Sequence, residues 1–261
     1  MLHANRARAE SFGAVAELYD RARPSYPAAL VDALLSAGAR SVLDVGCGTG
    51  IAASLFRARG CSVLGVEVDA RMAALARRKG VAVEVAAFER WEDRGRRFEL
   101  LIAAQAWHWV EPTAGAARAA AVLADGGTIA AFWNLGEPPL RLRELLAPLY
   151  ARFAPELENN SVVLGRNQGR VDETAVGLAA CCAFEPALER WFSWTQTYDA
   201  AAWVDFLRTH SDHQTLPPAQ LQSLLGAVAE AIESIGGSFE MAHETVLVSA
   251  RRRARTATAA A

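Results

Sequence analysis

Cysteine is scarce in this sequence, and its spacing excludes two kinds of site. The chain has four cysteines, Cys47, Cys61, Cys181 and Cys182. None of them forms the Cys-x-x-Cys pair of zinc or redox sites, and adjacent cysteines rarely bond to each other. No disulfide framework is therefore expected, which is typical of a reducing compartment. We expect a cytoplasmic protein on this ground.

Long apolar runs and a targeting segment are also missing. No stretch of about 18 consecutive apolar residues is present, so no membrane span is expected. Residues 1–10 are polar and lack the apolar segment of a signal peptide. The sequence thus predicts no contact with a membrane.

A strong excess of charge is lacking as well. The net charge is −2 at pH 7, so nucleic acid is not expected as a partner. The basic run 251–255 is short and is interpreted as a solvated, frayed tail. No metal site is expected, because the stretch His210-Ser211-Asp212-His213 lacks His-x-x-x-His spacing and a clear third ligand.

A glycine-rich loop is the feature around which the chain is organised. Residues 41–45 form an apolar-rich strand pattern, glycines stand at positions 46, 48 and 50, and residues 51–59 have a helical pattern. Glycine permits a positive φ and lets a ligand approach the backbone without a Cβ in the way. A strand, a glycine loop and a helix amino end in this order predict a ligand-binding turn.

Two carboxylates narrow the choice of ligand. Glu67 lies near the end of the next strand, about 20 residues beyond the loop, where a carboxylate reaches a ribose diol in such folds. Asp44 lies inside the first strand, an odd place for an acid unless it bonds loop amides or faces a cation. The dinucleotide pattern Gly-x-Gly-x-x-Gly would need glycine where Ile51 stands. A nicotinamide oxidoreductase is therefore disfavoured.

Strand and helix patterns alternate over residues 41–134, which predicts an α/β fold with a parallel sheet. The hydrophobic content of 52% suffices for one large domain. Strands are expected at 41–45, 62–69, 81–86, 98–104, 128–133, 190–197 and 239–250, with 125–127 as a turn.

The glycine loop and its acidic partners resemble the first motifs of class I S-adenosylmethionine-dependent methyltransferases of the small-molecule type. The likeness continues in the segment 12–34, in AQAWHW at 104–109 and in LADGGTIAAFWN at 123–134. It covers residues 11–135 well and residues 185–253 loosely. The resemblance implies a Rossmann-like, seven-stranded, mostly parallel sheet with helices on both faces, an antiparallel last strand and a helical cap or lid.

The same resemblance implies a single methyltransferase domain over residues 1–261. The cap and the lid are expected to close together over the pocket, because methyl transfer from a sulfonium benefits from excluding water. The expected parts are an N-terminal helical cap at 11–40, a cofactor-binding core at 41–135, a lid insertion at 137–185, the C-terminal part of the sheet at 186–250 and a tail at 251–261.

The implied cofactor is S-adenosylmethionine, with S-adenosylhomocysteine as product. Loop amides would face its methionine carboxylate, Asp44 its ammonium and Glu67 its ribose. Removing Glu67 is expected to affect folding little, because a strand end lies near solvent. The family's adenine-binding aspartate is replaced by Ala87. The expected cofactor-binding residues are Tyr19, Arg23, Asp44, Gly46, Cys47, Gly48, Gly50, Glu67, Val68, Phe88, Glu89 and Gln105.

The catalytic candidate is His108, which follows the fourth strand and could accept a proton from the nucleophile. A structural histidine bonded to the backbone is the alternative. Trp107 and His210 are expected at the substrate, whereas Trp109 is expected to pack in the core.

The predicted function is S-adenosylmethionine-dependent methyl transfer to an oxygen, nitrogen or carboxylate of a small molecule. Two alternatives stay open: a non-catalytic protein that binds S-adenosylmethionine or S-adenosylhomocysteine, and a methyltransferase acting on a macromolecule. A monomer or a homodimer is expected.

Overall fold

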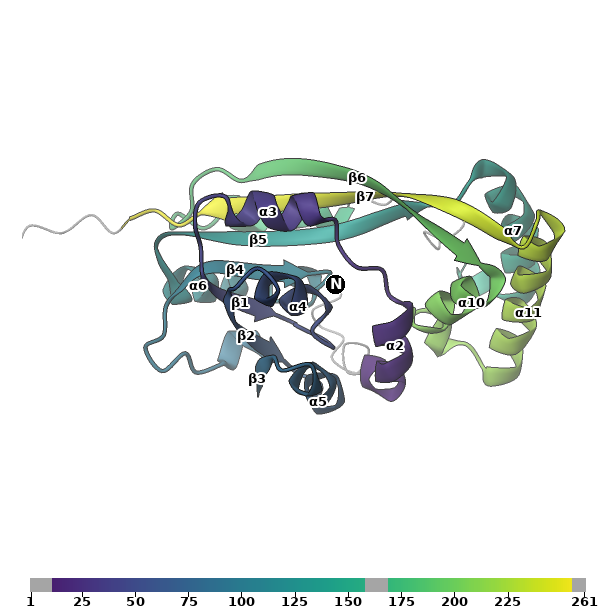
Figure 1. Ribbon diagram of the computed structural model, residues 1–261, viewed down its shortest axis with the longest axis horizontal. Helices are drawn as coiled ribbons and strands as arrows, with labels where there is room; N and C mark the ends of the chain where they lie inside the picture. Colours follow the sequence, from purple (N-terminus) through teal and green to yellow (C-terminus); the bar gives the residue numbers. More distant parts are fainter. Residues whose placement is uncertain (1–10, 158–168, 255–261) are drawn as a thin grey trace, which may run out of the picture.

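One sheet of seven strands, in the order β3-β2-β1-β4-β5-β7-β6, forms the centre of the molecule. The computed structural model describes residues 11–157 and 169–254 (Figure 1). Only β7 runs antiparallel to its neighbours, so the predicted mostly parallel sheet is confirmed. The strands are β1 (Ser41–Val45), β2 (Ser62–Glu67), β3 (Ala82–Val85), β4 (Phe98–Ala104), β5 (Leu123–Glu137), β6 (Leu188–Asp199) and β7 (Ser238–Arg251).

The strand order reverses between β1 and β4, which are paired through Val42 and Leu100. In open α/β sheets, ligands bind outside the carboxyl ends of the strands at such a switch point. Four of the five residues of β1 are buried, as is typical of a central parallel strand covered on both faces.

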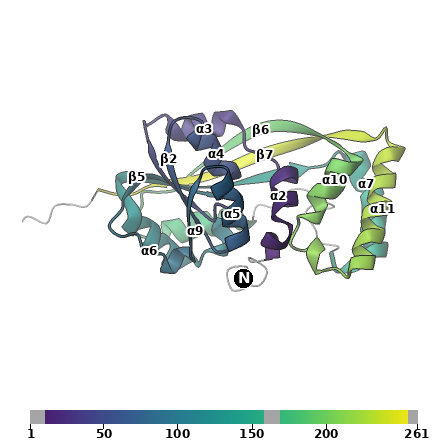
Figure 2. The same ribbon diagram turned by 60° about the horizontal axis from the view of Figure 1, so that its bottom comes forward.

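Helices cover both faces of the parallel part, as predicted. On one face, α3 (Ala28–Leu35), α4 (Ile51–Arg57) and α5 (Ala70–Arg78) pack on the sheet through residues such as Phe56. On the other face lie α6 (Pro112–Val122) and α9 (Gly169–Ala179). Figure 2 shows α3 and α6 on opposite sides of the strands.

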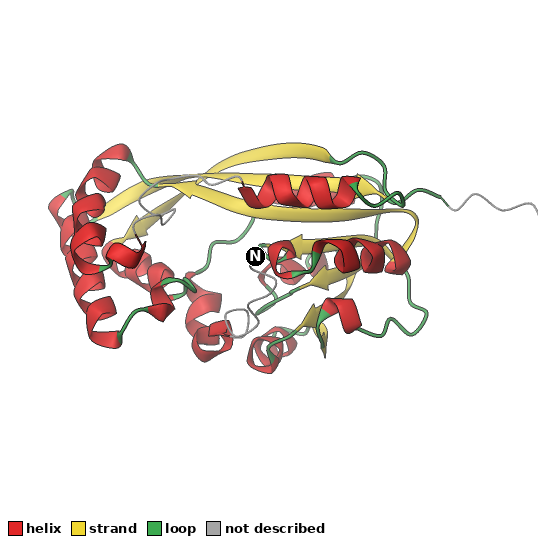
Figure 3. Ribbon diagram, turned by 180° about the vertical axis from the view of Figure 1, so that it is seen from behind, coloured by secondary structure: helices red, strands yellow, loops and turns green. Residues whose placement is uncertain are grey.

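A separate group of helices packs at the far end of the long strands. β5, β7 and β6 continue past the parallel strands and reach α7 (Leu140–Phe153), α10 (Ala200–Arg208) and α11 (Pro218–Ser234) (Figures 1 and 3). These helices share an apolar core that includes Leu146, Trp203 and Val228. We call them the distal helices.

The insertion 137–185, expected to form one lid, is divided between two places. Its first helix, α7, buries Leu142 and Leu146 among the distal helices, whereas α9 buries Val171 and Leu178 against α6 and the sheet. Each apolar face therefore has its own partner. Residues 158–168, between the two helices, lie outside the described residues.

The N-terminal cap begins with the short 3₁₀ helix η2 (Ser11–Val15) and continues as α2 (Ala16–Ala22). Helix α2 contacts both α5 and α10, so it lies between the parallel core and the distal helices (Figure 1). The predicted helix at 11–20 is thus extended by two residues, and its first turns are 3₁₀.

The fifth strand is longer than predicted. The expected turn at 125–127 lies within β5, where Gly126 has φ 74° and the pairing with β4 shifts register after Phe98. The pairing of β5 with β4 is therefore irregular at this stretch and regular from Thr128 onward.

The start of the basic run 251–255 is ordered, which corrects the expectation of a frayed tail. Arg251 Nε donates to the Gly126 carbonyl (3.0 Å) and Arg252 to the Leu123 carbonyl (2.8 Å). These bonds hold the end of β7 on the irregular start of β5. The last residues of the tail lie outside the described residues. Within the described ranges, no helix combines the length and the apolar character that crossing a membrane requires.

Candidate functional site

The glycine loop between β1 and α4 adopts the backbone that its sequence predicts. Gly46, Gly48 and Gly50 have φ of 66°, 55° and 81°. These left-handed values are rarely adopted by other residues. At Gly46 a Cβ would also lie 2.6 Å from the Ala106 Cβ, so the loop approaches the turn after β4 too closely for a side chain.

The loop amides are already used within the protein. Gly46 N and Cys47 N donate to the Val66 carbonyl (2.8 and 3.3 Å), and Gly48 N donates to Glu67 Oε2 (2.8 Å). Three loop amides are thus occupied by bonds within the protein, and contact of the loop and the helix amino end with the methionine carboxylate stays a prediction. Glu67 and the end of β2 brace the loop from one side.

Glu67 is buried, which corrects the expectation of a solvent-exposed strand end. Its side chain ends β2 at 7% exposure, and Oε1 accepts from Asp69 N (2.9 Å). Burial raises the pKa of this carboxyl, although the Asp69 and Gly48 amides oppose the shift. A carboxylate has about four acceptor positions, so Glu67 keeps acceptor capacity beyond its bonds to backbone amides, on the side that lines the cavity.

Asp44 is fully buried in β1, and neither of its oxygens has a hydrogen-bond partner among the described residues. Burial raises its pKa to about 8, and the negative charge of Glu67 adds to the shift, while the Ala53 amide opposes it. A bond to the loop amides, one of the two alternatives, is not made, and contact with the methionine ammonium stays a prediction. Asp44 lies behind the cavity wall and does not line it.

A cavity lies at the switch point, at the carboxyl ends of β1, β2 and β4. Its wall contains eight of the predicted site residues, which come from α2, the glycine loop, β2, the 3₁₀ helix η3 (Phe88–Arg90) and the end of β4. Sequence reasoning missed the rest of the wall, which comes from the strand ends, from α5 and from the turn after β4: Val45, Val66, Met72, Ala86, Ala104, Ala106, Trp109 and Val110. The predicted residues in the wall are Tyr19, Gly46, Gly48, Glu67, Val68, Phe88, Glu89 and Gln105.

The two residues after β3 that were expected at adenine have fixed positions. Phe88 is 3% exposed and packs on Trp91 and Trp107. Glu89 accepts a hydrogen bond from Glu111 N (3.0 Å) through Oε1. One apolar face and one carboxylate therefore line this end of the cavity.

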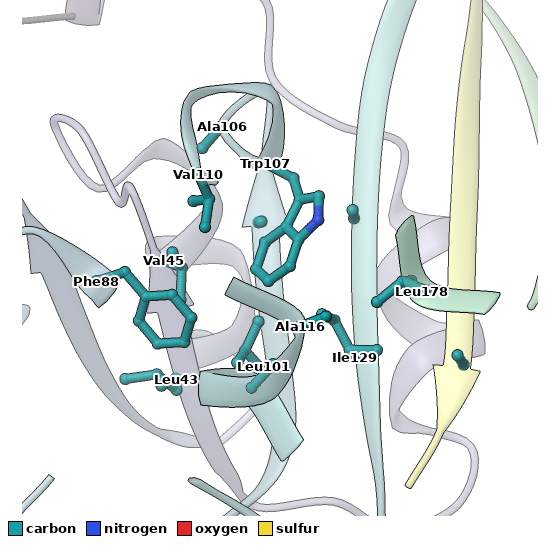
Figure 4. Packing of buried hydrophobic residues seen from close by; sticks show 14 of the residues in the cluster. Leu43, Val45, Phe88, Leu101, Ala106, Trp107, Val110, Ala116, Ile129 and Leu178 are labelled. Carbon is teal, nitrogen blue, oxygen red and sulfur yellow. The ribbon is translucent and has the colours of Figure 1, made fainter. Parts of the chain in front are cut away.

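The two tryptophans of the turn after β4 lie in each other's expected places: Trp107, expected at the substrate, lies in the core, and Trp109, expected in the core, lines the cavity. Trp107 is 4% exposed and packs between the sheet and α6, with Phe88 and Ala116 in the same cluster (Figure 4). Trp109 lines the cavity instead. The reason is local, because both lie in the 3₁₀ helix η4 (Trp107–Trp109), where side chains two residues apart point in different directions.

Arg23 does not line the cavity and instead forms hydrogen bonds that connect α2 to the end of α10. Its Nε donates to Thr209 Oγ1 (2.8 Å) and its Nη2 to the Thr209 carbonyl (2.8 Å). The guanidinium also lies 5.0 Å from the ring centre of Tyr19 and 5.2 Å from that of Phe206. Arg23 thus anchors α2 to α10 and holds Tyr19 beside the cavity.

Cys47 and Gly50 also lie outside the cavity wall. The Cys47 side chain is 6% exposed and fills the space beside Gly65, and burial raises the pKa of its thiol. Gly50 is the N-cap of α4 and lies against Ala76 of α5. Both residues pack on the side of the loop that faces away from the cavity, against Gly65 and Ala76.

His108 accepts a hydrogen bond at Nδ1 from Trp133 Nε1 (3.1 Å). In the neutral ring that accepts at Nδ1, the proton is on Nε2. Taking a further proton at Nδ1 would break the bond to Trp133. The geometry therefore favours a positioning role for His108 over the predicted role as a base.

His210 lies next to η6 (His213–Thr215), beside the distal helices and away from the cavity wall. One ligand atom each of His210, Asp212 and His213 lie within 4.8 Å of one another. His213 already uses both nitrogens, toward Tyr150 OH (2.8 Å) and Asp212 Oδ1 (2.9 Å). Burial raises the pKa of Asp212, but hydrogen bonds from His213 and the charges of His210 and His213 together outweigh it, and the net pKa is low. Hydrogen bonds thus satisfy the buried histidine.

Comparison with known proteins agrees with this geometry. Residues 19–132 match the family described as methyltransferase domain, and an uncharacterized methyltransferase of Mycobacterium tuberculosis is 38% identical over 144 residues. That match covers 52% of this chain and 57% of the relative, so the chain spans little more than half the length of the relative. The predicted resemblance to S-adenosylmethionine-dependent methyltransferases is confirmed as a likeness over residues 19–132.

Solved structures share the fold. A candidate type II methyltransferase from Anaeromyxobacter dehalogenans matches with a TM-score of 0.63 at 22% identity, covering 89% of this chain and 99% of that one. A Haemonchus contortus N-methyltransferase in complex with phosphomonomethylethanolamine and S-adenosylhomocysteine matches with a TM-score of 0.52 at 14% identity. It covers 97% of this chain and 59% of that one. At these identities the likeness concerns the fold alone.

Proposed function

We propose that this protein uses S-adenosylmethionine to methylate a small molecule. The observation that carries the proposal is the buried carboxylate of Glu67, which braces the glycine loop and faces the cavity with unused acceptor positions. A ribose diol offers two hydroxyl donors that match these positions.

The residues around the cavity fit the rest of this cofactor. Gly46 and Gly48 leave room for close approach to the backbone, and Phe88 and Glu89 would hold the adenine end. When bound, S-adenosylmethionine supplies a methyl group on a positively charged sulfur. The aromatic side chains of Tyr19 and Trp109, which also line the cavity, can hold a cation by an interaction worth about 0.5–2 kcal/mol.

Methyl transfer needs positioning and exclusion of water more than proton transfer. Helix α2 covers one side of the cavity through Tyr19, and Arg23 holds that helix in place. The chain's own residues would therefore bind the two reactants in line and keep water away from them.

A small molecule is supported as acceptor by two observations. The chain carries a net charge of −2, which does not favour a polyanionic substrate. The Haemonchus contortus structure, with a TM-score of 0.52, holds a small phosphorylated amine beside S-adenosylhomocysteine.

Calorimetry with S-adenosylhomocysteine and with NAD tests the cofactor. Binding of S-adenosylhomocysteine without binding of NAD is expected, and the reverse result would overturn the proposal. Release of S-adenosylhomocysteine from S-adenosylmethionine is then measured over a panel of hydroxyl, amine and carboxylate compounds. Tight cofactor binding without turnover across a broad panel would favour the non-catalytic binding protein.

A further inference from the structure

His243 is a buried histidine that the cavity described above does not use. Its side chain on β7 is 2% exposed, and neither Nδ1 nor Nε2 has a hydrogen-bond partner among the described residues. It is paired with Gly136 on β5 and Trp194 on β6. Burial lowers the pKa of His243 to about 4, so the ring is neutral at pH 7 and offers one donor and one acceptor.

Trp194, the aromatic neighbour of His243, is held in place by a series of hydrogen bonds. Trp194 stacks on the imidazole with ring centres 4.2 Å apart and an interplanar angle of 12°. Trp194 Nε1 donates to Thr245 Oγ1 (2.9 Å), which donates to Asn134 Oδ1 (2.7 Å). Asn134 Nδ2 donates in turn to the Ser25 carbonyl (3.0 Å). These hydrogen bonds orient Trp194, and none of them involves the imidazole of His243.

Two more buried polar atoms without a partner among the described residues lie in the same aromatic group. They are Tyr198 OH and Trp203 Nε1. The Tyr198 ring lies 6.3 Å from His243 and 5.1 Å from Trp203, measured between ring centres. Native proteins pair most of their buried polar atoms, so four such atoms in one group indicate a polar ligand.

On the side that faces β5, a flexible side chain lies beside the imidazole. A Cβ at Gly136 would lie 3.1 Å from both Nδ1 and Cε1 of His243, and 2.0 Å from Met241 Cε. The Met241 methyl group therefore occupies the space that glycine leaves beside the ring. Methionine is unbranched and adaptable, so it can vacate this space for a ligand.

A series of contacts connects this group to the cofactor cavity. Gln105 lines the cavity, and its Nε2 donates to the Asn134 carbonyl (3.4 Å). Asn134 is paired with Thr245, and His243 stands two residues further along the same face of β7. The rise along a strand puts His243 about 7 Å beyond Thr245. A molecule in this space would lie beside the cofactor, on the side covered by α10.

We propose that His243, Trp194 and Tyr198 form the acceptor subsite and take a neutral aromatic ring that carries a hydroxyl group. The proposal rests on the methyltransferase function proposed above. A hydroxyl both donates and accepts, which matches the neutral imidazole, and the aromatic side chains around His243 favour an aromatic partner. A charged acceptor would lose its hydration without a counterion, because the three side chains are uncharged at pH 7.

Phenol is the test ligand, with toluene and benzoate as controls of the same shape. Each is titrated into protein with ¹⁵N-labelled histidine, with and without saturating S-adenosylhomocysteine. Phenol is expected to shift the His243 ring nitrogens, which are assigned from the spectrum of His243→Phe. Toluene and benzoate are expected to shift them little. A spectrum in which phenol leaves the His243 signals unchanged overturns the subsite.

Variant affinities provide the second measurement. Phenol is expected to bind wild type at least tenfold more tightly than His243→Phe, with toluene binding both alike, and His243→Asn is expected to recover part of the loss. Equal phenol affinity in wild type and His243→Phe overturns the proposal. If His243→Phe fails to fold, His243→Asn supplies the assignment and the comparison. Calorimetry with S-adenosylhomocysteine on wild type keeps this outcome distinct from failure of the proposed function.

Discussion

At the scale of the residue, Glu67 shows how one carboxylate serves both the fold and the ligand. One oxygen accepts from Gly48 N and the other from Asp69 N, while the side chain faces the cavity. A glutamine at this position can accept with only one end, and its NH₂ group would face the second amide. The loop and the ribose site are therefore coupled through a single side chain.

Glu67→Gln is expected to weaken binding of S-adenosylhomocysteine by about 10- to 100-fold, since hydrogen bonds to a charged group contribute about 1.5–3 kcal/mol. The melting temperature should fall as well, because an N–H is left facing a donor. Calorimetry and thermal unfolding measure the two effects. Glu84→Gln is the matched control, since Glu84 on the next strand bonds Trp91 and Arg96 outside the cavity. Equal affinity in Glu67→Gln and wild type would place the ribose elsewhere.

Asp44 predicts a pH effect on stability. Its pKa is raised from 3.8 to about 8, so between these values the folded state binds more protons than the unfolded state. Its contribution to the free energy of unfolding therefore falls as the pH rises from about 4 to about 8. Asp44→Asn removes this titration. The melting temperature of Asp44→Asn relative to wild type should be higher at pH 9 than at pH 5, and a difference that does not change with pH would contradict the raised pKa.

At the scale of the element, helix α2 is held by few contacts that can be removed one at a time. Arg23 makes two hydrogen bonds to Thr209, whereas Arg21 on the same helix makes only an exposed ion pair with Asp205 at 3.6 Å. Exposed ion pairs contribute about 0–1 kcal/mol, so Arg21 serves as the control.

Arg23→Gln is expected to speed hydrogen exchange in the peptide that contains α2 by several-fold, because the helix loses its anchor on α10. Arg21→Gln should leave exchange there nearly unchanged. Mass spectrometry of exchanged peptides measures both variants. Similar exchange in the two would show that the bonds from Arg23 do not anchor α2.

The N-terminal cap and the second helix of the insertion 137–185 should respond differently to ligand. Helix α2 lines the cavity through Tyr19, whereas α9 packs against α6 on the other face of the sheet. Addition of S-adenosylhomocysteine is therefore expected to slow exchange in α2 and in the glycine loop, with α9 unaffected. Slowing in α9 would instead support the single lid that the sequence predicts.

At the scale of the whole molecule, two insertions far apart in sequence are joined by one buried hydrogen bond. Tyr150 in α7 bonds His213 Nε2 at 2.8 Å, and both side chains are at most 1% exposed. α7 follows β5 and η6 lies between β6 and β7, so this contact ties together the parts of the chain that extend the sheet.

Tyr150→Phe is expected to lower the free energy of unfolding by about 1–3 kcal/mol, because it leaves the His213 Nε2 buried without its partner. Urea denaturation measures the loss. Tyr198→Phe is the matched control, since the Tyr198 hydroxyl is buried without a partner among the described residues and its removal should cost nothing. A loss of similar size in both variants would show that the bond to His213 contributes little.

The local features of the cofactor site could be predicted because they depend on short stretches of chain. The glycines at 46, 48 and 50, the strand before them and the acid at the end of the next strand follow from backbone sterics and spacing. Alternating strand and helix patterns likewise indicated the parallel sheet and helices on both faces. The residues that carry these signals interact mainly with neighbours in sequence or in the adjacent strand.

What depends on distant contacts was decided only by the tertiary structure. The direction in which Trp107 and Trp109 point depends on how η4 packs against α6, and the burial of Glu67 depends on the loop that folds over it. The division of the lid depends on which apolar surface each of its helices meets, among the distal helices or on the sheet. The sequence did not indicate His243 as a ligand-binding residue, because its neighbours Gly136 and Trp194 are brought to it by the pairing of β5, β6 and β7. Periodicity gives a side chain its face on an element, but the partner of that face is fixed by the packing of the whole chain.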